Sequence, residues 1–280
     1  MVNPYEITEP TCVSFSGGRT SGYMLYQVLQ AHGGKLPDDA IVCFANTGKE
    51  EEATLKFVHD CEVNWNVKIH WLEYQYAEKT SDRWKLVNFE TANRNGQPFF
   101  ESINQNGSPY LPNPVARICT TNMKIRVIHK YLQSLGWKHN EQSDWVGIRY
   151  DEQRRAAKME RSRTPLVTAK VTKETVGDFW KAQPFDLGLP NMNGVTMHGN
   201  CDLCFLKPTH QIISLIREKP ERADWWIKME NHAQSSNKTY GDGAKFRKDR
   251  PSYAKLKEFA LSQQELFDPT EEAIACFCGE

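Results

Sequence analysis

The sequence has no excess of charge of either sign. Lysine and arginine together number 35, aspartate and glutamate also number 35, and the formal net charge is +0. A protein dedicated to binding polyanions usually carries a basic excess. The balance therefore argues against nucleic acid as the main partner, although it leaves room for a local basic patch.

Long apolar runs are also missing. No stretch approaches the roughly 18 apolar residues that a membrane span needs, and the first thirty residues lack the pattern of a signal peptide. We therefore expect a cytoplasmic protein with no membrane partner. In that compartment, the eight cysteines favour metal binding or redox chemistry over structural disulfides.

Buried strands alternate with helices in the first part of the chain. Apolar runs at 11–15, 41–45 and 67–72 are separated by helical patterns at 21–29 and 50–65. This alternation predicts an α/β fold, with a doubly wound, mostly parallel sheet. A further helix that ends at Gly136 and a strand at 145–148 extend the pattern.

The expected domain organisation follows from where this pattern stops. We predict a nucleotide-binding α/β domain over residues 1–208, and a helical region with a cysteine-containing tail over 209–280. Within the first domain, residues 88–117 are rich in Asn, Gly and Pro and predict a long loop insertion. Such a loop is either a binding lid or a surface insertion.

A candidate phosphate loop, SFSGGRTS, occupies residues 14–21. Two glycines stand where a buried strand turns into a helix, a geometry that exposes backbone amides at the positive end of the helix dipole. The triplet SGG alone is often a simple turn, but its place after the first strand favours anion binding. The anion-binding residues predicted here are Ser16, Gly17, Gly18, Arg19, Thr20 and Ser21.

Some cysteines are candidates for metal binding or catalysis, and others are expected in the core. Cys201 and Cys204 have the CxxC spacing with which a loop presents two thiolates to one metal. The tail adds Cys276 and Cys278, either of which is a candidate ligand or nucleophile. Three more cysteines lie in apolar strand or helix patterns and are expected in the core: Cys12, Cys43 and Cys61.

Five segments in order along residues 12–207 carry a family resemblance. They are SGGxxS after the first strand, FANTGKEEEATLKFV at 44–58, RICTTNMK at 117–124, DWVGIRYDEQRRA at 144–156 and GNCDLC at 199–204. Together they resemble the phosphoadenosine phosphosulfate (PAPS) reductase branch of the PP-loop superfamily. The resemblance implies an adenine nucleotide (PAPS, APS or ATP) on the loop and a thioredoxin-like reductant as partner, and it is compatible with a homo-oligomer.

The resemblance also assigns roles to individual residues. It implies a [4Fe–4S] cluster, or alternatively zinc, held by Cys119, Cys201, Cys204 and Cys276. It implies Cys278 as nucleophile, with Arg149 and Lys124 as further catalytic residues. Beyond the phosphate loop, the nucleotide-binding residues that it implies are Asn46, Thr47, Gly48, Gly147, Arg149, Arg154 and Arg155.

Two departures from the family patterns keep alternatives open. Thr20 stands where many pyrophosphatases of the superfamily carry an acidic residue, and Ile118 precedes Cys119 where the reductases usually present paired cysteines. The first hypothesis is reduction of an adenylyl sulfate to sulfite. The second is an ATP pyrophosphatase, with Mg²⁺, that activates a nucleic-acid or small-molecule acceptor for sulfur insertion. The third is a non-catalytic module that binds nucleotide and zinc.

Overall fold

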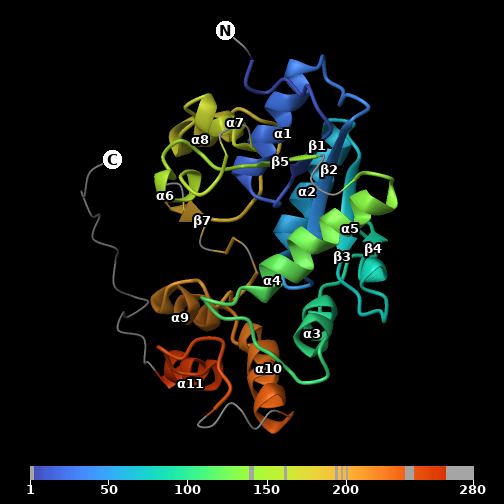
Figure 1. The fold of residues 1–280 in the computed structure, drawn as a ribbon. Helices are drawn as coiled ribbons and strands as arrows, with labels where there is room; N and C mark the ends of the chain where they lie inside the picture. Colours follow the sequence, from blue (N-terminus) through green and yellow to red (C-terminus); the bar gives the residue numbers. More distant parts are fainter. Residues whose placement is uncertain are drawn as a thin grey trace, which may run out of the picture.

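The computed structural model describes residues 3–138, 142–160, 163–192, 195–196, 198–199, 201–236 and 243–262. Its centre is a five-stranded sheet with the strand order β4-β3-β2-β1-β5 (Figure 1). The strands are β1 Thr11–Ser14, β2 Ala40–Asn46, β3 Ile69–Glu73, β4 Lys85–Val87 and β5 Ser143–Val146. None of the helices in these ranges is long and apolar enough to cross a membrane.

The strand directions confirm the predicted fold class. β1 runs parallel to both β2 and β5, β2 runs parallel to β3, and only the edge strand β4 is antiparallel. The predicted strands and helices recur within a few residues of their expected bounds. The protein is therefore an α/β protein with a doubly wound, mostly parallel sheet, and the chain changes direction across the sheet between β1 and β5.

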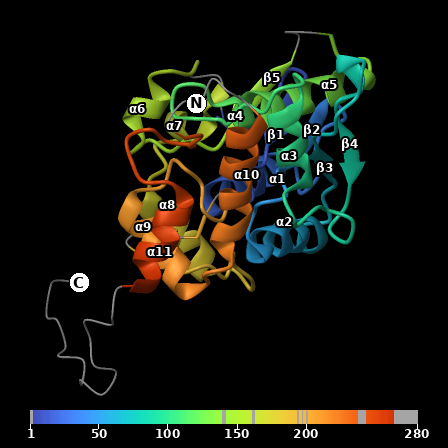
Figure 2. The same cartoon turned by 90° about the horizontal axis from the view of Figure 1, so that it is seen from below.

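Helices cover both faces of the sheet (Figures 1 and 2). On one face, Val13 and Phe44 pack with α1, α2 and α8; on the other, Cys12 and Cys43 pack with α3, α5 and the C-terminal helices. Successive strand residues thus point to opposite faces, as the pleat requires. The bounds are α1 Arg19–Ala31, α2 Glu52–Asn64, α3 Gln97–Asn104, α5 Arg126–Ser134 and α8 Lys173–Lys181.

Several short elements complete the first part of the chain. A 3-10 turn, Thr80–Asp82, precedes β4. The others are α4 Ile118–Thr120, a π-helical turn Thr121–Ile125 that leads into α5, α6 Gln153–Ala156, α7 Pro165–Thr168, and the two-residue strands β6 Asn191–Met192 and β7 Val195–Thr196.

The C-terminal helices share the core of the sheet. They are α9 Thr209–Glu218, α10 Arg222–Ser236 and α11 Tyr253–Ser262, and they lie together beside the sheet in Figure 1. Their buried side chains, among them Trp226 and Tyr253, belong to the same apolar cluster as Leu72 of β3 and Leu132 of α5. The core is therefore continuous across residue 208.

The segment 88–117 differs from the expected irregular loop because it contains α3. Gly96 has φ 82° just before the helix, and Pro98 stands in its first turn. Phe99 and Ile103, four residues apart, are buried in the core cluster. The Gly-x-Pro start and this spacing are helix signals that the abundance of turn residues concealed.

The three cysteines expected in the core are there. Cys12, Cys43 and Cys61 are each 0% exposed. Burial raises the pKa of the Cys61 thiol. A hydrogen-bonding interaction with the free thiol of Cys43, together with burial, raises the pKa of Cys12. These thiols act as small apolar side chains.

Candidate functional site

The predicted phosphate loop is built around the hydroxyl of Ser21. Its Oγ accepts hydrogen bonds from the amides of Ser16 (3.2 Å) and Gly18 (3.3 Å) and donates to the carbonyl of Gly18 (2.9 Å). Because α1 begins at Arg19, its first amides have no acceptor within the helix. The loop is therefore closed on itself while the leading end of α1 stays available to an anion.

Gly17 is the residue that lets this loop pack. Its φ is 75°, and a Cβ there would lie 2.6 Å from Cγ2 of Thr54 and 3.2 Å from the ring of Phe44. A side chain at this position would meet both backbone strain and a clash. The glycine is thus required by the contact between the loop and α2.

Gly147 packs against the start of α1 from the side of β5. It follows β5, and a Cβ on it would lie 3.1 Å from Cα of Ser21. The start of α1 is therefore pressed against the end of β5. In open α/β sheets, ligands bind where the connections that follow two neighbouring strands run to opposite faces of the sheet. Here these two strands are β1 and β5.

Arg149 reaches across this point to the loop. Its Nη1 donates to Oγ1 of Thr20 at 3.0 Å, while its Nε donates to Oδ1 of Asp151 at 3.0 Å, and the side chain is 19% exposed. A guanidinium thus stands at the first turn of α1. Of the predicted arginines, it is the one that the structure brings to the loop.

Arg19 points elsewhere than the sequence suggested. Its Nε bonds Oδ1 of Asp186 at 2.7 Å, and its Nη2 bonds the carbonyl of Leu189 at 3.0 Å. Its Nη1 also reaches Oγ1 of Thr196 at 3.2 Å. The guanidinium therefore fastens the segment before β6 and β7 to α1. An aspartate 167 residues further along the chain could not be foreseen as its partner.

Arg154 and Arg155 lie on the exposed surface of α6. Arg155 forms an ion pair with Glu152, which also accepts the amide of Arg149. Among the bonds of the described residues, none joins either arginine to the phosphate loop. A role at the nucleotide stays a prediction for both.

The second predicted loop, Asn46 to Gly48, is turned inward. Asn46 is 0% exposed; its amide donates to Oε1 of Glu73 at 2.7 Å, and its Oδ1 accepts the amide of Gly48 at 3.0 Å. Thr47 donates its hydroxyl to the carboxylate of Glu50. These side chains shape the loop after β2, and their contact with a nucleotide stays a prediction.

The CxxC loop docks on this second loop. The Sγ of Cys201 lies 3.4 Å from Oγ1 of Thr47, Cys201 pairs with Glu50 in an isolated bridge, and the amide of Asp202 donates to the carbonyl of Lys49 at 2.8 Å. The pair of cysteines is thus attached to the carboxyl end of β2. This places it on the same sheet edge as the phosphate loop.

The thiol of Cys119 lies near the two cysteines of this loop. Burial and the neighbouring Cys204 raise the pKa of the Cys119 thiol, and burial, Glu50 and Cys204 raise the pKa of Cys201. The three predicted ligands therefore share one partly buried region. Within the described residues, however, no three His, Cys, Asp or Glu side chains are grouped closely enough to hold a metal ion.

Lys124 faces the thiols. Its Nζ lies 3.9 Å from Oε1 of Glu50. Burial lowers the pKa of Lys124, but Glu50 and the three cysteines outweigh it, and the pKa is raised above its usual value. A charged ammonium thus accompanies any thiolate formed there. It sits on the π-helical turn, a local widening that often marks functional sites.

A clamp around the CxxC loop was missed by the sequence reasoning. Nζ of Lys207 donates to the carbonyls of Gly199 (2.5 Å) and Cys201 (2.7 Å). The hydroxyl of Tyr253 donates to the carbonyl of Leu203 at 2.6 Å, and Nε1 of Trp226 donates to Asp202 at 2.9 Å. The C-terminal helices therefore hold this loop in place. Only the aromatic residues of these helices hinted at such packing.

The two tail cysteines cannot be placed in this arrangement. Cys276 and Cys278 lie outside the described residues. Their roles as fourth ligand and nucleophile therefore stay predictions.

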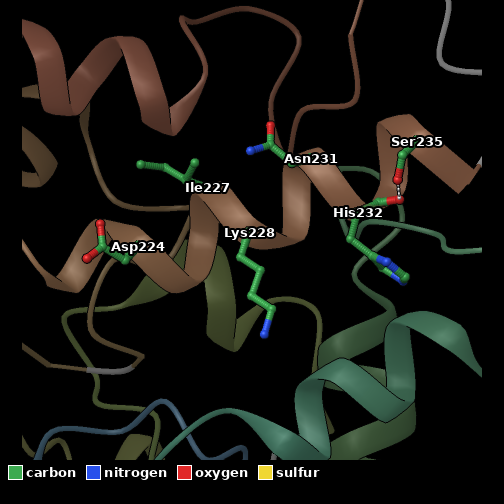
Figure 3. A pocket seen from close by; sticks show the side chains of 6 residues that line it. All are labelled: Asp224, Ile227, Lys228, Asn231, His232 and Ser235. Atoms are coloured by element: carbon green, nitrogen blue, oxygen red, sulfur yellow. Dashed lines mark hydrogen bonds between the residues drawn. The ribbon is translucent and has the colours of Figure 1, made fainter.

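The hollow along α10 does not belong to this site. Figure 3 shows the six side chains of α10 that line it: Asp224, Ile227, Lys228, Asn231, His232 and Ser235. None of these six residues was predicted to bind a ligand. The candidate site is instead the edge formed by the loops after β1, β2 and β5.

Fold and site together define the class of the protein: a doubly wound α/β protein with a glycine-containing loop at the switch point of its sheet. No family model matches the chain. It is 30% identical over 205 residues to the "Uncharacterized nin region protein ORF290" of Escherichia phage lambda. The aligned region covers 71% of this chain and 67% of the phage protein. The chain belongs to the family of this phage lambda protein.

Proposed function

We propose that the protein binds an adenine nucleotide at the phosphate loop and reduces an adenylyl sulfate to sulfite. The proposal is carried by the contact between Arg149 and the hydroxyl of Thr20. It sets a permanent cation beside the amide-rich start of α1. A sulfate or phosphate suits this combination because guanidinium and backbone amides are both donors to its oxygens.

The same contact favours a sulfonucleotide over Mg²⁺-bound ATP. A Mg²⁺ site requires oxygen ligands, usually including a carboxylate. At Thr20 the structure offers a hydroxyl already engaged by an arginine. Charge on the nucleotide would then be neutralised by Arg149 rather than by a metal ion.

The thiols beside this loop supply the second part of the proposal. To hold a [4Fe–4S] cluster, or zinc, Cys119, Cys201 and Cys204 would have to draw closer together than they lie in this structure, with the predicted Cys276 as fourth ligand. Such a group would adjust the electrostatic field beside the substrate. Lys124 would keep a positive charge between these thiols and the nucleotide.

The proposed reaction begins with a cysteine thiolate, predicted as Cys278. It attacks the sulfur of the sulfuryl group, an S–S bond forms, and the S–O bond to the nucleotide phosphate breaks. The electron pair of that bond leaves on the nucleotide phosphate, where Arg149 would stabilise it. A dithiol of the thioredoxin type then attacks the modified cysteine, releases sulfite and becomes a disulfide.

Calorimetry with APS, PAPS and ATP, before and after changing Arg149, tests the nucleotide site. We expect APS or PAPS to bind more tightly than ATP, and Arg149→Ala to weaken that binding about tenfold to a hundredfold, the cost of a charge-assisted bond. Arg217→Ala, an exposed arginine of α9, is the matched control and should bind as the parent does. Flat titrations with all three nucleotides on metal-replete protein would contradict the proposal.

ATP cleavage is the second candidate, and one observation favours it. The loop contains Gly17 and Gly18, and Gly17 has a left-handed backbone conformation. Such a backbone can turn successive amides toward a pyrophosphate. Pyrophosphate release from ATP, without sulfite release from PAPS, would identify this activity. The acceptor for sulfur, a nucleic acid or a small molecule, would then have to be sought.

A further inference from the structure

A small cavity lies beyond the end of β3 and shares no lining residue with the phosphate loop. Its volume is about 220 Å³, and seven residues line it: Tyr74, Thr80, Arg83, Gln105, Asn122, Arg126 and Lys130. We call it the β3 pocket. Three of its seven residues are cationic, and no aspartate or glutamate lines it.

The three cations of the β3 pocket lack acidic partners. Arg83 donates to the carbonyl of Ala77 and Arg126 to Oδ1 of Asn122, at 2.8 and 2.9 Å. No carboxylate of the described residues pairs with either arginine or with Lys130.

Two carboxylates of neighbouring segments are bonded elsewhere. Asp82 accepts the hydroxyl of Ser81 at 2.7 Å, and Glu101 accepts the amide of Tyr76 at 2.7 Å. Neither lines the cavity. The lining of the β3 pocket itself therefore carries three cations and no carboxylate.

Mutual repulsion is visible at Lys130. Burial and the charges of Arg83 and Arg126 lower the pKa of this lysine. The three groups are thus near enough to affect one another. An anion between them would relieve this repulsion and return the lysine to its usual range.

Neutral groups complete the lining. Asn122 is 6% exposed, and Tyr74 is 3% exposed, with its hydroxyl 3.5 Å from Oε1 of Gln105. Buried amides and hydroxyls of this kind fix the orientation of a ligand. Because Asn122 belongs to the π-helical turn that begins two residues after Cys119, the β3 pocket and the thiols share one structural element.

We propose that the β3 pocket is a second anion site, which binds the phosphate or sulfate group of a small ligand. Drug-sized ligands occupy sites of about 300–1,000 Å³, so this smaller cavity suits one anionic group and its nearest atoms. The zero net charge of the chain argues against a nucleic-acid backbone as the ligand. The site does not depend on the reaction proposed at the phosphate loop.

Amide NMR during titration with inorganic phosphate, and separately with sulfate, tests the proposal. We expect shifts at residues 80–83 and 122–130 that saturate, and an affinity about tenfold weaker in Lys130→Met and in Arg126→Gln, each of which removes one charge-assisted bond. Lys255→Met, an exposed lysine of α11, should retain the parent affinity. Resonances of residues 16–21 report on the phosphate loop separately.

Three results would overturn the proposal. The first is the absence of saturable shifts at the β3 pocket with either anion. The second is unchanged affinity in both variants, whose remaining resonances show that they are folded. The third is a response of these residues to a short single-stranded oligonucleotide but to neither free anion, which would assign the surface to nucleic acid.

Discussion

At the scale of single residues, the sequence predicted loop conformation better than it predicted the partners of long side chains. Loop conformation depends on local residue types, whereas such a partner can lie far away in the sequence. Gly17 was predicted to lie in a turn between a strand and a helix. The structure gives it a left-handed φ of 75°, which only glycine adopts freely. Anion binding by Arg19 stays a prediction, and the structure adds a partner for this side chain, Asp186, that lies far away in the sequence. A local pattern indicates a loop conformation, but it does not identify the partner of a long side chain.

Replacement of Gly17 by alanine separates strain from packing. Gly17→Ala should lower the free energy of unfolding by about 2–4 kcal/mol, because left-handed strain adds to the clash with Thr54. Gly34→Ala is the matched control: φ is 89° there, but nothing lies within 4 Å of the added Cβ, and a cost of about 1–2 kcal/mol is expected. Urea unfolding measures both variants, and equal losses would refute the packing role of Gly17.

At the scale of elements, hydrophobic periodicity predicted the parallel strands and their helices. It did not reveal β4, which has three residues, or α3, which is surrounded by turn-forming residues. The CxxC spacing pointed to a loop with two thiols, and the structure shows what holds that loop. Tyr253 of α11 and Trp226 of α10 bond to Leu203 and Asp202, contacts that no local pattern encodes.

Glu230 makes the packing of these helices sensitive to pH. Its carboxylate is 5% exposed and accepts the amides of Phe246 (3.3 Å) and Tyr253 (2.8 Å), while burial raises its pKa from 4.5 to about 7. Between these two pH values the folded protein binds the proton that the unfolded chain has released. The free energy of unfolding should therefore fall as the pH rises from 4.5 to 7, by up to about 3 kcal/mol.

Chemical denaturation across this pH range measures the effect of Glu230. Glu230→Gln cannot titrate, so the difference in stability between parent and variant should change with pH across the window and level off above 7. Glu258→Gln, an exposed carboxyl of α11, is the control and should keep the slope of the parent. Parallel curves for parent and Glu230→Gln would mean that Glu230 is ionised throughout.

At the scale of the whole molecule, one apolar cluster joins the sheet to α9, α10 and α11. The sheet contributes Leu72 and Cys43, and the C-terminal helices contribute Trp226 of α10 and Tyr253 of α11. A chain that ends at residue 208 would keep α3 and α5 on this face of the sheet but would lose the cover of α9, α10 and α11. We expect such a chain to lose cooperative unfolding, because it forfeits much of the buried apolar area that offsets conformational entropy.

A chain that ends at residue 262 distinguishes the fold from the proposed chemistry. It keeps α11 and with it all of the described core, so its thermal unfolding and its binding of adenylyl sulfate should match those of the full chain. It lacks Cys276 and Cys278, so release of sulfite should be abolished, since the predicted nucleophile is gone. Cys278→Ser in the full chain should give the same loss of activity with folding intact. Release of sulfite by the shortened chain would mean that the attacking thiolate is a cysteine of the described residues. Cys119, Cys201 and Cys204 would then be the residues to replace next, because they belong to the candidate site.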